Sequence, residues 1–303
     1  MEIQQIQDSI VAAFGNVAAP NPGKIIREMD SKSLRDAEQF RQIIAGRNWT
    51  NLDSDFLNKW WSSYYYLSPE AYCYYLPALL IGALKELPNA LGLMNLVMFS
   101  IRPSFWEIYY NGEDHEFNLQ QMNYTEAQFR SVCAFLGMVF ESIPHERHRA
   151  AQALYWGWNR YDTPELEAAN RYYLEMRSFA YPESDDPEIA RLFKVIRDAF
   201  ADTPYPGDDN LSGSDQGDEP AENAMDLRGV KWQSAHPVLL ARCYTALSFL
   251  TDAGFRYFLP AFLLENLSNY DSNVNPVFDL TRGFYDRTMS SLDIAMDSRS
   301  RSI

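Results

Sequence analysis

Apolar side chains recur every three or four residues along most of this chain, which is the spacing of an amphipathic helix. The first such stretch covers residues 2–15, whose apolar stripe is formed by Ile3, Ile6, Ile10, Ala13 and Phe14. Apolar and polar residues do not alternate over any long segment, so we predict an all-α fold. The same spacing predicts further helices over residues 30–47, 69–87, 125–140 and 146–158.

One stretch of the chain occurs twice. Residues 49–84 match residues 232–267 without a gap, at a constant offset of 183. A repeat of this length indicates two copies of one structural unit. The matching residues are mostly apolar or aromatic, so we expect them to be structural and to lie in two equivalent cores. The clearest matches are Trp49, Tyr74 and Pro77 in the first copy and Trp232, Tyr257 and Pro260 in the second.

The repeat predicts how the chain is divided. We expect a first helical-bundle unit over residues 1–160, a connecting helix or linker over 161–187, and a second unit over 188–303. The two units should pack against each other. The match also extends upstream, because the loop Pro20-Asn21-Pro22-Gly23 is repeated as Pro204-Tyr205-Pro206-Gly207.

Each copy places a proline inside a predicted helix, at Pro77 and at Pro260. A proline in a helix interior removes one backbone hydrogen bond and clashes with the carbonyl four residues earlier, at a cost of about 3 kcal/mol. Because both copies carry this residue, we expect a bent helix that the unit needs for its packing.

The two copies also differ. Where the first copy has the predicted helix 30–47, the second has residues 208–226, which hold seven acids and no base. Such a composition buries little apolar surface, so we expect a mobile acidic loop there. The second copy is also shorter. It lacks the segments that follow the matched core in the first copy, and we expect its apolar surface to stay bare or to be covered by the first unit.

Each copy opens with an amphipathic helix that ends in Ala-Phe, at Ala13-Phe14 and Ala199-Phe200, and continues through the Pro-x-Pro-Gly loop to a single tryptophan. A hydroxyl-flanked turn then leads into an aromatic segment that ends in Leu-Pro-Ala, and Tyr124-Thr125-Glu126 opens the closing helices. In these features the chain resembles a bacterial family, the domain of unknown function 6714, over residues 3–158 and 190–270. The resemblance implies a small helical module of the cytoplasm, here in tandem, and it carries over no functional residue.

The net charge narrows the classes of partner. The chain carries a formal charge of −15 and has an isoelectric point near 4.7. Non-specific nucleic-acid binding and anionic membranes both require clusters of Lys and Arg, so we expect neither nucleic acid nor membrane as a partner. The longest uncharged apolar stretch, residues 71–84, is too short to cross a bilayer. Three cysteines form no recognisable disulfide or zinc pattern, which favours a reducing compartment and a cytoplasmic location.

The candidate chemistry is sparse. His145 and His148 are three residues apart and could share a metal on a helix, but neighbouring arginines make a solvated helix start the better interpretation. His115 lies between two acids in a polar segment, an arrangement that is frequent by chance. His236 matches Asp53 in the repeat, and we expect the two to share no chemistry. Known nucleophile, nucleotide and calcium motifs do not occur, so we assign no catalytic residue, cofactor or metal.

Aromatic residues supply the remaining candidates. Trp60, Trp61, Tyr64 and Tyr65 wrap around more than one face of a helix, so some of these rings must approach the surface. They either pack between the two units or form an anchor patch for a protein partner, since Trp and Tyr dominate interface hot spots.

We therefore expect a non-catalytic protein-interaction module of the adaptor or the immunity and inhibitor type, for which a basic protein would be a fitting partner. The alternative is an enzyme whose carboxylates and tyrosines line a cleft between the two units.

Overall fold

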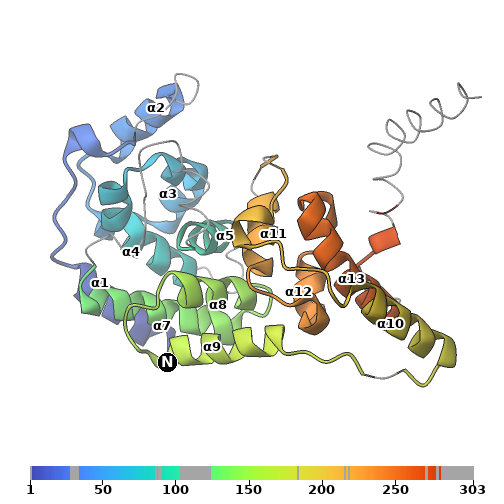
Figure 1. The fold of residues 1–303 in the computed structure, drawn as a ribbon. Helices are drawn as coiled ribbons and strands as arrows, with labels where there is room; N and C mark the ends of the chain where they lie inside the picture. The colour runs from blue at the N-terminus through green and yellow to red at the C-terminus, as the bar shows by residue number, and fades with distance from the viewer. Residues whose placement is uncertain are drawn as a thin grey trace, which may run out of the picture. The chain divides into compact units, whose positions relative to one another are not determined.

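The computed structural model describes residues 2–27, 34–85, 87, 91–102, 124–182, 184–214, 216–217, 219–269, 272–277 and 280. Within these residues the chain forms helices and turns, and the only β-structure is two isolated bridges (Figure 1). The predicted all-α fold is confirmed. The chain divides into two compact units, Met1–Tyr172 and Tyr173–Ile303, and the boundary falls inside α9 (Pro164–Arg177).

Unit 1 is built around α1 (Ile3–Phe14), which packs against both α4 (Pro69–Lys85) and α7 (Glu126–Ser142). Of the predicted apolar face of α1, Ile6, Ile10 and Phe14 are completely buried, whereas Ile3 in the first turn is 41% exposed. The other described elements of unit 1 are α2 (Leu34–Ile44), α3 (Ser54–Lys59), α5 (Leu91–Ser100) and α8 (Arg147–Trp156), with the 3-10 helices η1 (Pro22–Lys24), η2 (Trp49–Asn51) and η3 (Trp61–Tyr66).

Unit 2 repeats the first part of this order. Its opening helix α10 (Pro187–Phe200) corresponds to α1 and packs against α13 (Asp252–Ser268), which corresponds to α4. The elements between them follow the same sequence as in unit 1. They are η5 (Asp208–Asn210), α11 (Glu219–Leu227), η6 (Trp232–Ser234), α12 (Pro237–Arg242) and η7 (Ala246–Ser248).

In unit 1 a single hydroxyl ties the helix α4 to the loop that follows α1. Ser68 Oγ accepts a hydrogen bond from the Ala71 amide at 3.2 Å, which caps the helix. The same hydroxyl donates to the carbonyl of Lys24 at 2.6 Å, and the Ser68 amide donates to the carbonyl of Ile25 at 2.8 Å. We call this arrangement the hydroxyl clasp.

Unit 2 contains the same clasp with a different residue. Thr251 Oγ1 caps α13 by accepting from the Gly254 amide at 3.0 Å, and it donates to the carbonyl of Asn210 at 2.7 Å. The Thr251 amide donates to the carbonyl of Leu211 at 2.9 Å. Since Ile25 and Leu211 are both buried beneath their clasp, the two units close this loop in the same way.

The clasps fix the register of the repeat upstream of the gap-free match. Ser68 and Thr251 are 183 residues apart, whereas their partners Lys24 and Asn210 are 186 apart. Asp208 therefore takes the place of Pro22 at the start of its 3-10 helix. The alignment of Pro20–Gly23 with Pro204–Gly207 that the sequence suggests has an offset of 184 and therefore differs by two residues from the structural alignment. Equivalent backbone positions in this loop do not carry identical residues.

Residues 208–226 are not the loop that their composition predicts. They include η5 and most of α11, in which Pro220, Ala224 and Leu227 are buried at helical spacing. Two of the three acids of α11, Glu219 and Glu222, lie in its first turn, where the helix dipole favours negative charge, and the third, Asp226, is buried near its end. The total charge of the segment does not show that its apolar residues recur at helical spacing. α11 also ends like α2, since Gly46 and Gly229 follow the two helices with φ of 74° and 64°.

The repeated prolines lie inside continuous helices. Both α4 and α13 run for 17 residues through Pro77 and Pro260, so neither proline separates two helices. Tyr74 and Tyr257, three residues before these prolines, are buried, as are Trp49 and Trp232 at the start of η2 and η6. A bend at each proline remains a prediction.

Candidate functional site

The aromatic residues that the sequence offered for partner binding lie at the turn from α3 into η3 in unit 1. Trp60 is partly exposed and packs against Phe40, with ring centroids 6.0 Å apart. Tyr65 is also partly exposed and meets the ring of Phe99 edge-on at 6.2 Å. The side chain of Trp61 lies outside the described residues.

Tyr64 occupies a different position from the one that partner binding requires. Only 3% of its surface is exposed, and its ring meets Phe40 edge-on at 5.4 Å. Burial raises the pKa of its hydroxyl, with a smaller contribution from Tyr75. Tyr64 therefore belongs to the core of unit 1 and is not available as a surface anchor. The reason is that η3 is a 3-10 helix, whose three-residue period turns this ring inward.

The equivalent turn in unit 2 leads from α12 into η7 and presents an aromatic ring to solvent. Tyr244 matches Trp61 in the repeat, and 49% of its surface is exposed. The residue before it, Cys243, is completely buried. The buried Cys243 therefore anchors the backbone of the turn in the core, while the side chain of Tyr244 projects into solvent.

A polar cluster lies beneath this turn, formed by Glu219, Asn223 and Asp226 of α11 and by Arg242, Cys243 and Thr245. We call it the α11–α12 network. Its centre is an ion pair, in which Arg242 Nε donates to Asp226 Oδ2 at 2.8 Å. The side chain of Asp226 is 3% exposed and that of Arg242 is 21% exposed. Burial opposes the charged form of Arg242, but the Asp226 carboxylate outweighs it, and the pKa of the guanidinium rises.

Cys243 completes the centre of the network as a protonated thiol. Burial raises its pKa well above the usual value, and the nearby Asp226 charge raises it further. Its Sγ lies 3.8 Å from Asp226 Oδ2, as a weak donor. A thiol acts as a nucleophile only as the thiolate, so this cysteine is held in its unreactive form.

The outer part of the network links α11 to the residue after Tyr244. Thr245 Oγ1 donates to Glu219 Oε1 at 2.6 Å and accepts from Asn223 Nδ2 at 3.3 Å. Bonds on both sides of Tyr244 therefore hold the turn that carries the exposed ring.

Unit 1 carries apolar residues at three of the six positions of this network. Asn223, Asp226 and Cys243 correspond to Phe40, Ile43 and Trp60 at the offset of 183. The sequence did not predict this network, because only the matching positions of the two copies were interpreted. The positions at which the copies differ do indicate it, since Phe40, Ile43 and Trp60 of the first copy are replaced by hydrogen-bonding residues in the second.

The two histidines at the start of α8 lie in different surroundings. His148 is buried with its Nδ1 3.2 Å from the Tyr172 hydroxyl, whereas His145 is exposed, so the two imidazoles do not face one site. His115 lies outside the described residues. Among the residues that the structure places, no group of three or more His, Cys, Asp or Glu side chains is arranged to hold a metal ion.

His236 does share a role with Asp53, contrary to expectation. Its Nδ1 accepts from the Val238 amide at 3.1 Å and caps α12, as Asp53 Oδ1 accepts from the Phe56 amide at 2.8 Å and caps α3. The neutral imidazole and the carboxylate both offer a lone pair to the same turn of equivalent helices.

A buried carboxyl lies elsewhere in unit 2. Glu265 of α13 is 2% exposed and lies beside the hydroxyl of Tyr181. Burial raises the pKa of Glu265, while contacts from Ser272, Asn269 and Tyr181 partly oppose the rise. Burial likewise raises the pKa of Tyr181, and the Glu265 charge adds to it.

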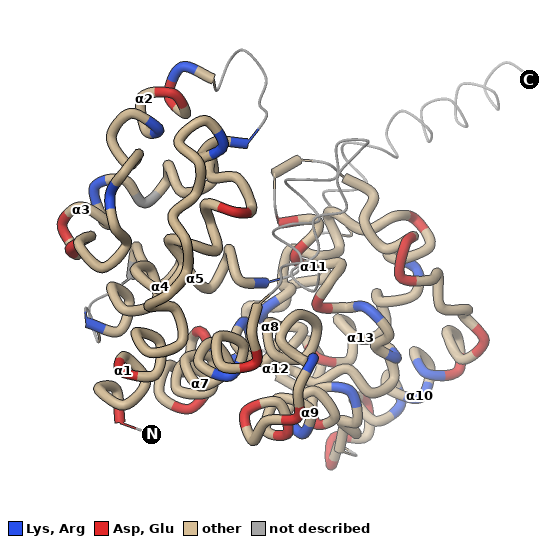
Figure 2. Tube along the Cα trace, turned by 90° about the vertical axis from the view of Figure 1, so that its left-hand side faces the viewer, with Lys and Arg blue, Asp and Glu red and all other residues tan. Residues whose placement is uncertain are grey.

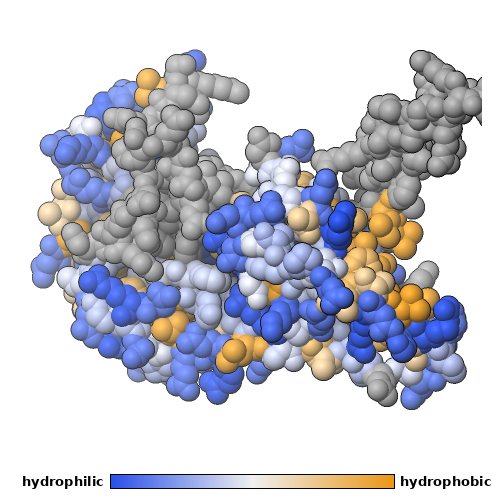
Figure 3. Space-filling view, viewed as in Figure 1, coloured by the Kyte–Doolittle hydropathy of each residue, from blue (hydrophilic) through white to orange (hydrophobic). Residues whose placement is uncertain are grey.

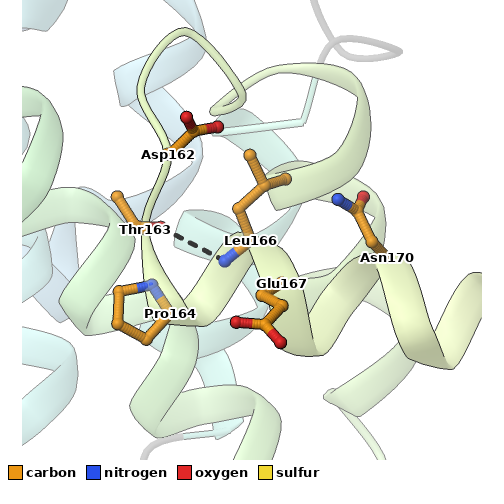
Figure 4. A pocket seen from close by; sticks show the side chains of 6 residues that line it. All are labelled: Asp162, Thr163, Pro164, Leu166, Glu167 and Asn170. Atoms are coloured by element: carbon orange, nitrogen blue, oxygen red, sulfur yellow. Dashed lines mark hydrogen bonds between the residues drawn. The ribbon is translucent and has the colours of Figure 1, made fainter.

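A hollow of about 380 Å³ lies in unit 1 at the start of α9 (Figure 4). Thr163 Oγ1 accepts from the Leu166 amide at 3.2 Å and caps the helix. The carboxylates of Asp162 and Glu167 point in different directions in Figure 4 and do not converge on one point. These residues support the helix start and form no catalytic arrangement. The hollow is lined by Asp162, Thr163, Pro164, Leu166, Glu167 and Asn170.

The family comparison agrees with the repeat. The model of a family of unknown function, DUF6714, matches residues 3–161 and again residues 188–290. The chain belongs to the DUF6714 family. Its two copies stand in tandem, and the second match continues past the end of α13. No curated protein and no solved structure matches the chain. In the described part of this DUF6714 protein, no helix combines the length and apolar character needed to cross a bilayer.

Proposed function

We propose that this DUF6714 protein is a non-catalytic protein-interaction module of the cytoplasm, which contacts its partner through the turn between α12 and η7 of unit 2. The observation that carries the proposal is Tyr244, an aromatic ring that is 49% exposed on a turn held by the buried Asp226–Arg242 pair. An exposed aromatic side chain on a rigid support is typical of an interface anchor, because little conformational entropy is lost on binding.

The charge around the turn favours a basic protein as partner. Glu222 and the surface-exposed Glu219 lie on α11, close to Arg242 and Thr245 respectively. One arginine, already paired with Asp226, faces these acids. Figure 2 shows Asp and Glu positions along helices of both units, in keeping with the net charge of −15. Complementary charge would speed association and select the partner.

The test compares three full-length chains as baits in a native extract at low and moderate salt. We expect the unchanged chain and Leu174→Ala to retain the same protein, and Tyr244→Ala to lose at least about tenfold in affinity, as for a hot-spot aromatic. Leu174 is the matched control because it is an exposed apolar residue outside the turn. Retention of no protein at either salt concentration, or equal retention by Tyr244→Ala, would contradict the proposal.

One observation favours the alternative of an enzyme. Glu265 and Tyr181 form a carboxylate–tyrosine pair with raised pKa values, the combination expected for acid–base chemistry. The pair lies within unit 2 and is almost completely buried, so a substrate would need an opening to reach it. An activity of the unchanged chain that Glu265→Gln abolishes would support this alternative, and an activity that survives the substitution would exclude this pair as its site.

A further inference from the structure

The segment that follows α9 runs along unit 2 without helical structure, and we call residues 178–182 the strap. Its side chains alternate in burial, as expected for an extended backbone. Phe179 and Tyr181 turn inward, whereas the three residues around them are exposed. The amide of Phe179 donates to the carbonyl of Ser234 at the end of η6, at 3.1 Å.

Tyr181 fixes the end of the strap in the core of unit 2. It is 6% exposed, and its ring meets Phe193 of α10 edge-on with the centroids 6.3 Å apart. The ring of Phe179 meets it edge-on at 5.0 Å. The hydroxyl of Tyr181 faces the carboxyl of Glu265 in α13, which is 2% exposed. An ionisable group therefore lies beneath the strap.

Glu265 has no ionisable counterpart in unit 1. At the offset of 183 its position is that of Gly82 in α4, where an added Cβ would lie 2.6 Å from Leu57 and 2.8 Å from Leu93 of α5. Apolar side chains therefore fill this place in unit 1. Among the described residues that follow α13, no helix takes the place of α5, and Tyr181 lies at this position instead. The packing of the unit thus does not require a carboxyl there.

The contact between Tyr181 and Glu265 is imperfect. Within the described part of the chain, neither Tyr181 Oη nor Glu265 Oε2 forms a hydrogen bond of ordinary geometry, although both atoms are buried. A buried carboxylate is costly unless hydrogen bonds compensate its lost hydration. Tyr181 opposes this cost together with Ser272 and Asn269, which follow α13. A protonated Glu265 therefore suits the closed strap, whereas an ionised Glu265 favours contact with water.

Other charged and titratable groups lie around the strap. The ring of His236 meets Phe179 edge-on at 4.8 Å, and the charge of Glu175 in α9 acts on this imidazole. On α10, the guanidinium of Arg197 lies 5.5 Å from the centre of the Phe193 ring. His236 titrates in the same range of pH as a shifted carboxyl, so a test must separate the two groups.

We infer that Glu265 and Tyr181 form a pH-sensitive latch, in which loss of the Glu265 proton releases the strap from α13 while the rest of unit 2 stays folded. Release lets water reach the carboxylate and takes Tyr181 away from the ring of Phe193. Figure 3 shows hydrophobic side chains, in orange, gathered where α10 and α13 lie, and release would enlarge this apolar surface. The latch requires no substrate and does not involve the Tyr244 turn, so it is separate from both functions proposed above.

The strap is closed in acid and opens as the pH rises. Burial raises the pKa of Glu265 while the strap is closed, whereas in the open state water surrounds the carboxyl. Closure is therefore fully stabilised below the open-state pKa, and this stabilisation is lost as the pH rises through the closed-state pKa. Protonation of His236 has the opposite sign, because it removes the cap of α12 as the pH falls.

Hydrogen exchange of the Phe179 amide in the full-length chain measures opening, since the closed strap holds this amide on the Ser234 carbonyl. Protection is measured from pH 5 to pH 8, corrected for the intrinsic rate, in the unchanged chain and in Glu265→Gln. The ratio of protection in Glu265→Gln to that in the unchanged chain should rise with pH, by up to about tenfold per pH unit. Both chains contain His236, so its contribution cancels in the ratio.

Asp252→Asn is the matched control, because it removes an exposed carboxyl from the first turn of the same helix. It should leave the pH dependence of the unchanged chain as it is. Tyr181→Phe keeps the ring but removes the hydroxyl that opposes the cost of an ionised Glu265. This variant should lose more protection at Phe179 at pH 8 than at pH 5.

Two results would overturn the inference. The first is a ratio of protection that stays constant from pH 5 to pH 8, since ionisation of Glu265 would then not control the strap. The second is an equal loss of protection at Phe179 and at Phe262 in the middle of α13, since unit 2 would then unfold as a whole instead of opening locally.

Discussion

His236 and Asp53 cap the first turns of α12 and α3, which are equivalent helices of the two units. The imidazole accepts this hydrogen bond only through an unprotonated ring nitrogen. The cap of α12 therefore depends on the protonation state of His236.

The first prediction concerns the stability of unit 2 near pH 6. Burial lowers the pKa of His236, while the charge of Glu175 partly opposes this. With the folded pKa below the unfolded value of about 6.5, the cap contributes fully above pH 6.5. Its contribution is lost as the pH falls from there through the folded pKa, because the unfolded chain takes up the proton first.

The measurement is the free energy of unfolding of the unchanged chain and of His236→Asn between pH 8 and pH 5. Asn caps helices well and does not titrate, so the variant should show a smaller loss of stability over this range. If both proteins lose the same free energy, the His236 cap is not the titrating group.

The second prediction concerns the Asp226–Arg242 pair. Asp226→Ala should lower the free energy of unfolding by about 3 kcal/mol, because it leaves a largely buried guanidinium without its partner. Replacing both members by apolar residues, as in Asp226→Ile with Arg242→Met, should recover most of this loss, since unit 1 already carries Ile43 at the first position. Denaturant titration of both variants checks the order. A double variant less stable than Asp226→Ala would show that the network stabilises by more than its ion pair.

The third prediction concerns the hydroxyl clasps. Ser68→Ala and Thr251→Val should each lower the free energy of unfolding by about 1–2 kcal/mol, since each removes a helix cap and leaves a loop carbonyl without its donor. Ser62→Ala, at an exposed position in the same unit as Ser68, should change stability by less than about 0.5 kcal/mol. Denaturant unfolding measures all three, and a clasp variant indistinguishable from Ser62→Ala would refute the role given to that hydroxyl.

The fourth prediction concerns Glu265. Its folded pKa is raised, so the protonated carboxyl favours folding fully below its unfolded pKa, and this stability is lost as the pH rises through the folded pKa. Glu265→Gln should therefore raise the unfolding midpoint at pH 7 and change it little at pH 4. Asp202→Asn, an exposed site in unit 2, serves as the control and should show no such pH-dependent gain. A gain of equal size at both pH values would mean that ionisation of Glu265 is not the cause.

The internal sequence repeat and the helical spacing of apolar residues predicted the core and most of the helices. Trp49 and Trp232, or Pro77 and Pro260, lie at equivalent buried points, because an apolar residue requires burial whichever neighbour provides it. The aromatic pattern offered Tyr64 as one of four candidates for partner binding, but its ring is buried in the core of unit 1. The composition also predicted a loop in place of α11, because an average of charges over 208–226 conceals which positions share a helical face.

The candidate site was beyond this kind of prediction. Asp226 and Arg242 are 16 residues apart, and only the tertiary structure brings the end of α12 against α11 so that they meet. The clasp between Thr251 and Asn210 joins residues 41 positions apart in the sequence. The spacing of these residues in the sequence predicts neither contact. The replacement of Phe40 in the first copy by Asn223 in the second nevertheless indicates where the α11–α12 network lies.

The sequence by itself determined that this protein is a helical unit made twice, and which faces of its helices are apolar. Tertiary structure alone decided which polar groups meet, how the loops register and where an aromatic ring reaches solvent. Burial of apolar surface is non-directional and is recorded position by position along the chain. A hydrogen bond or ion pair requires two particular atoms at about 3 Å with the correct angle, and only the packed helices supply that distance.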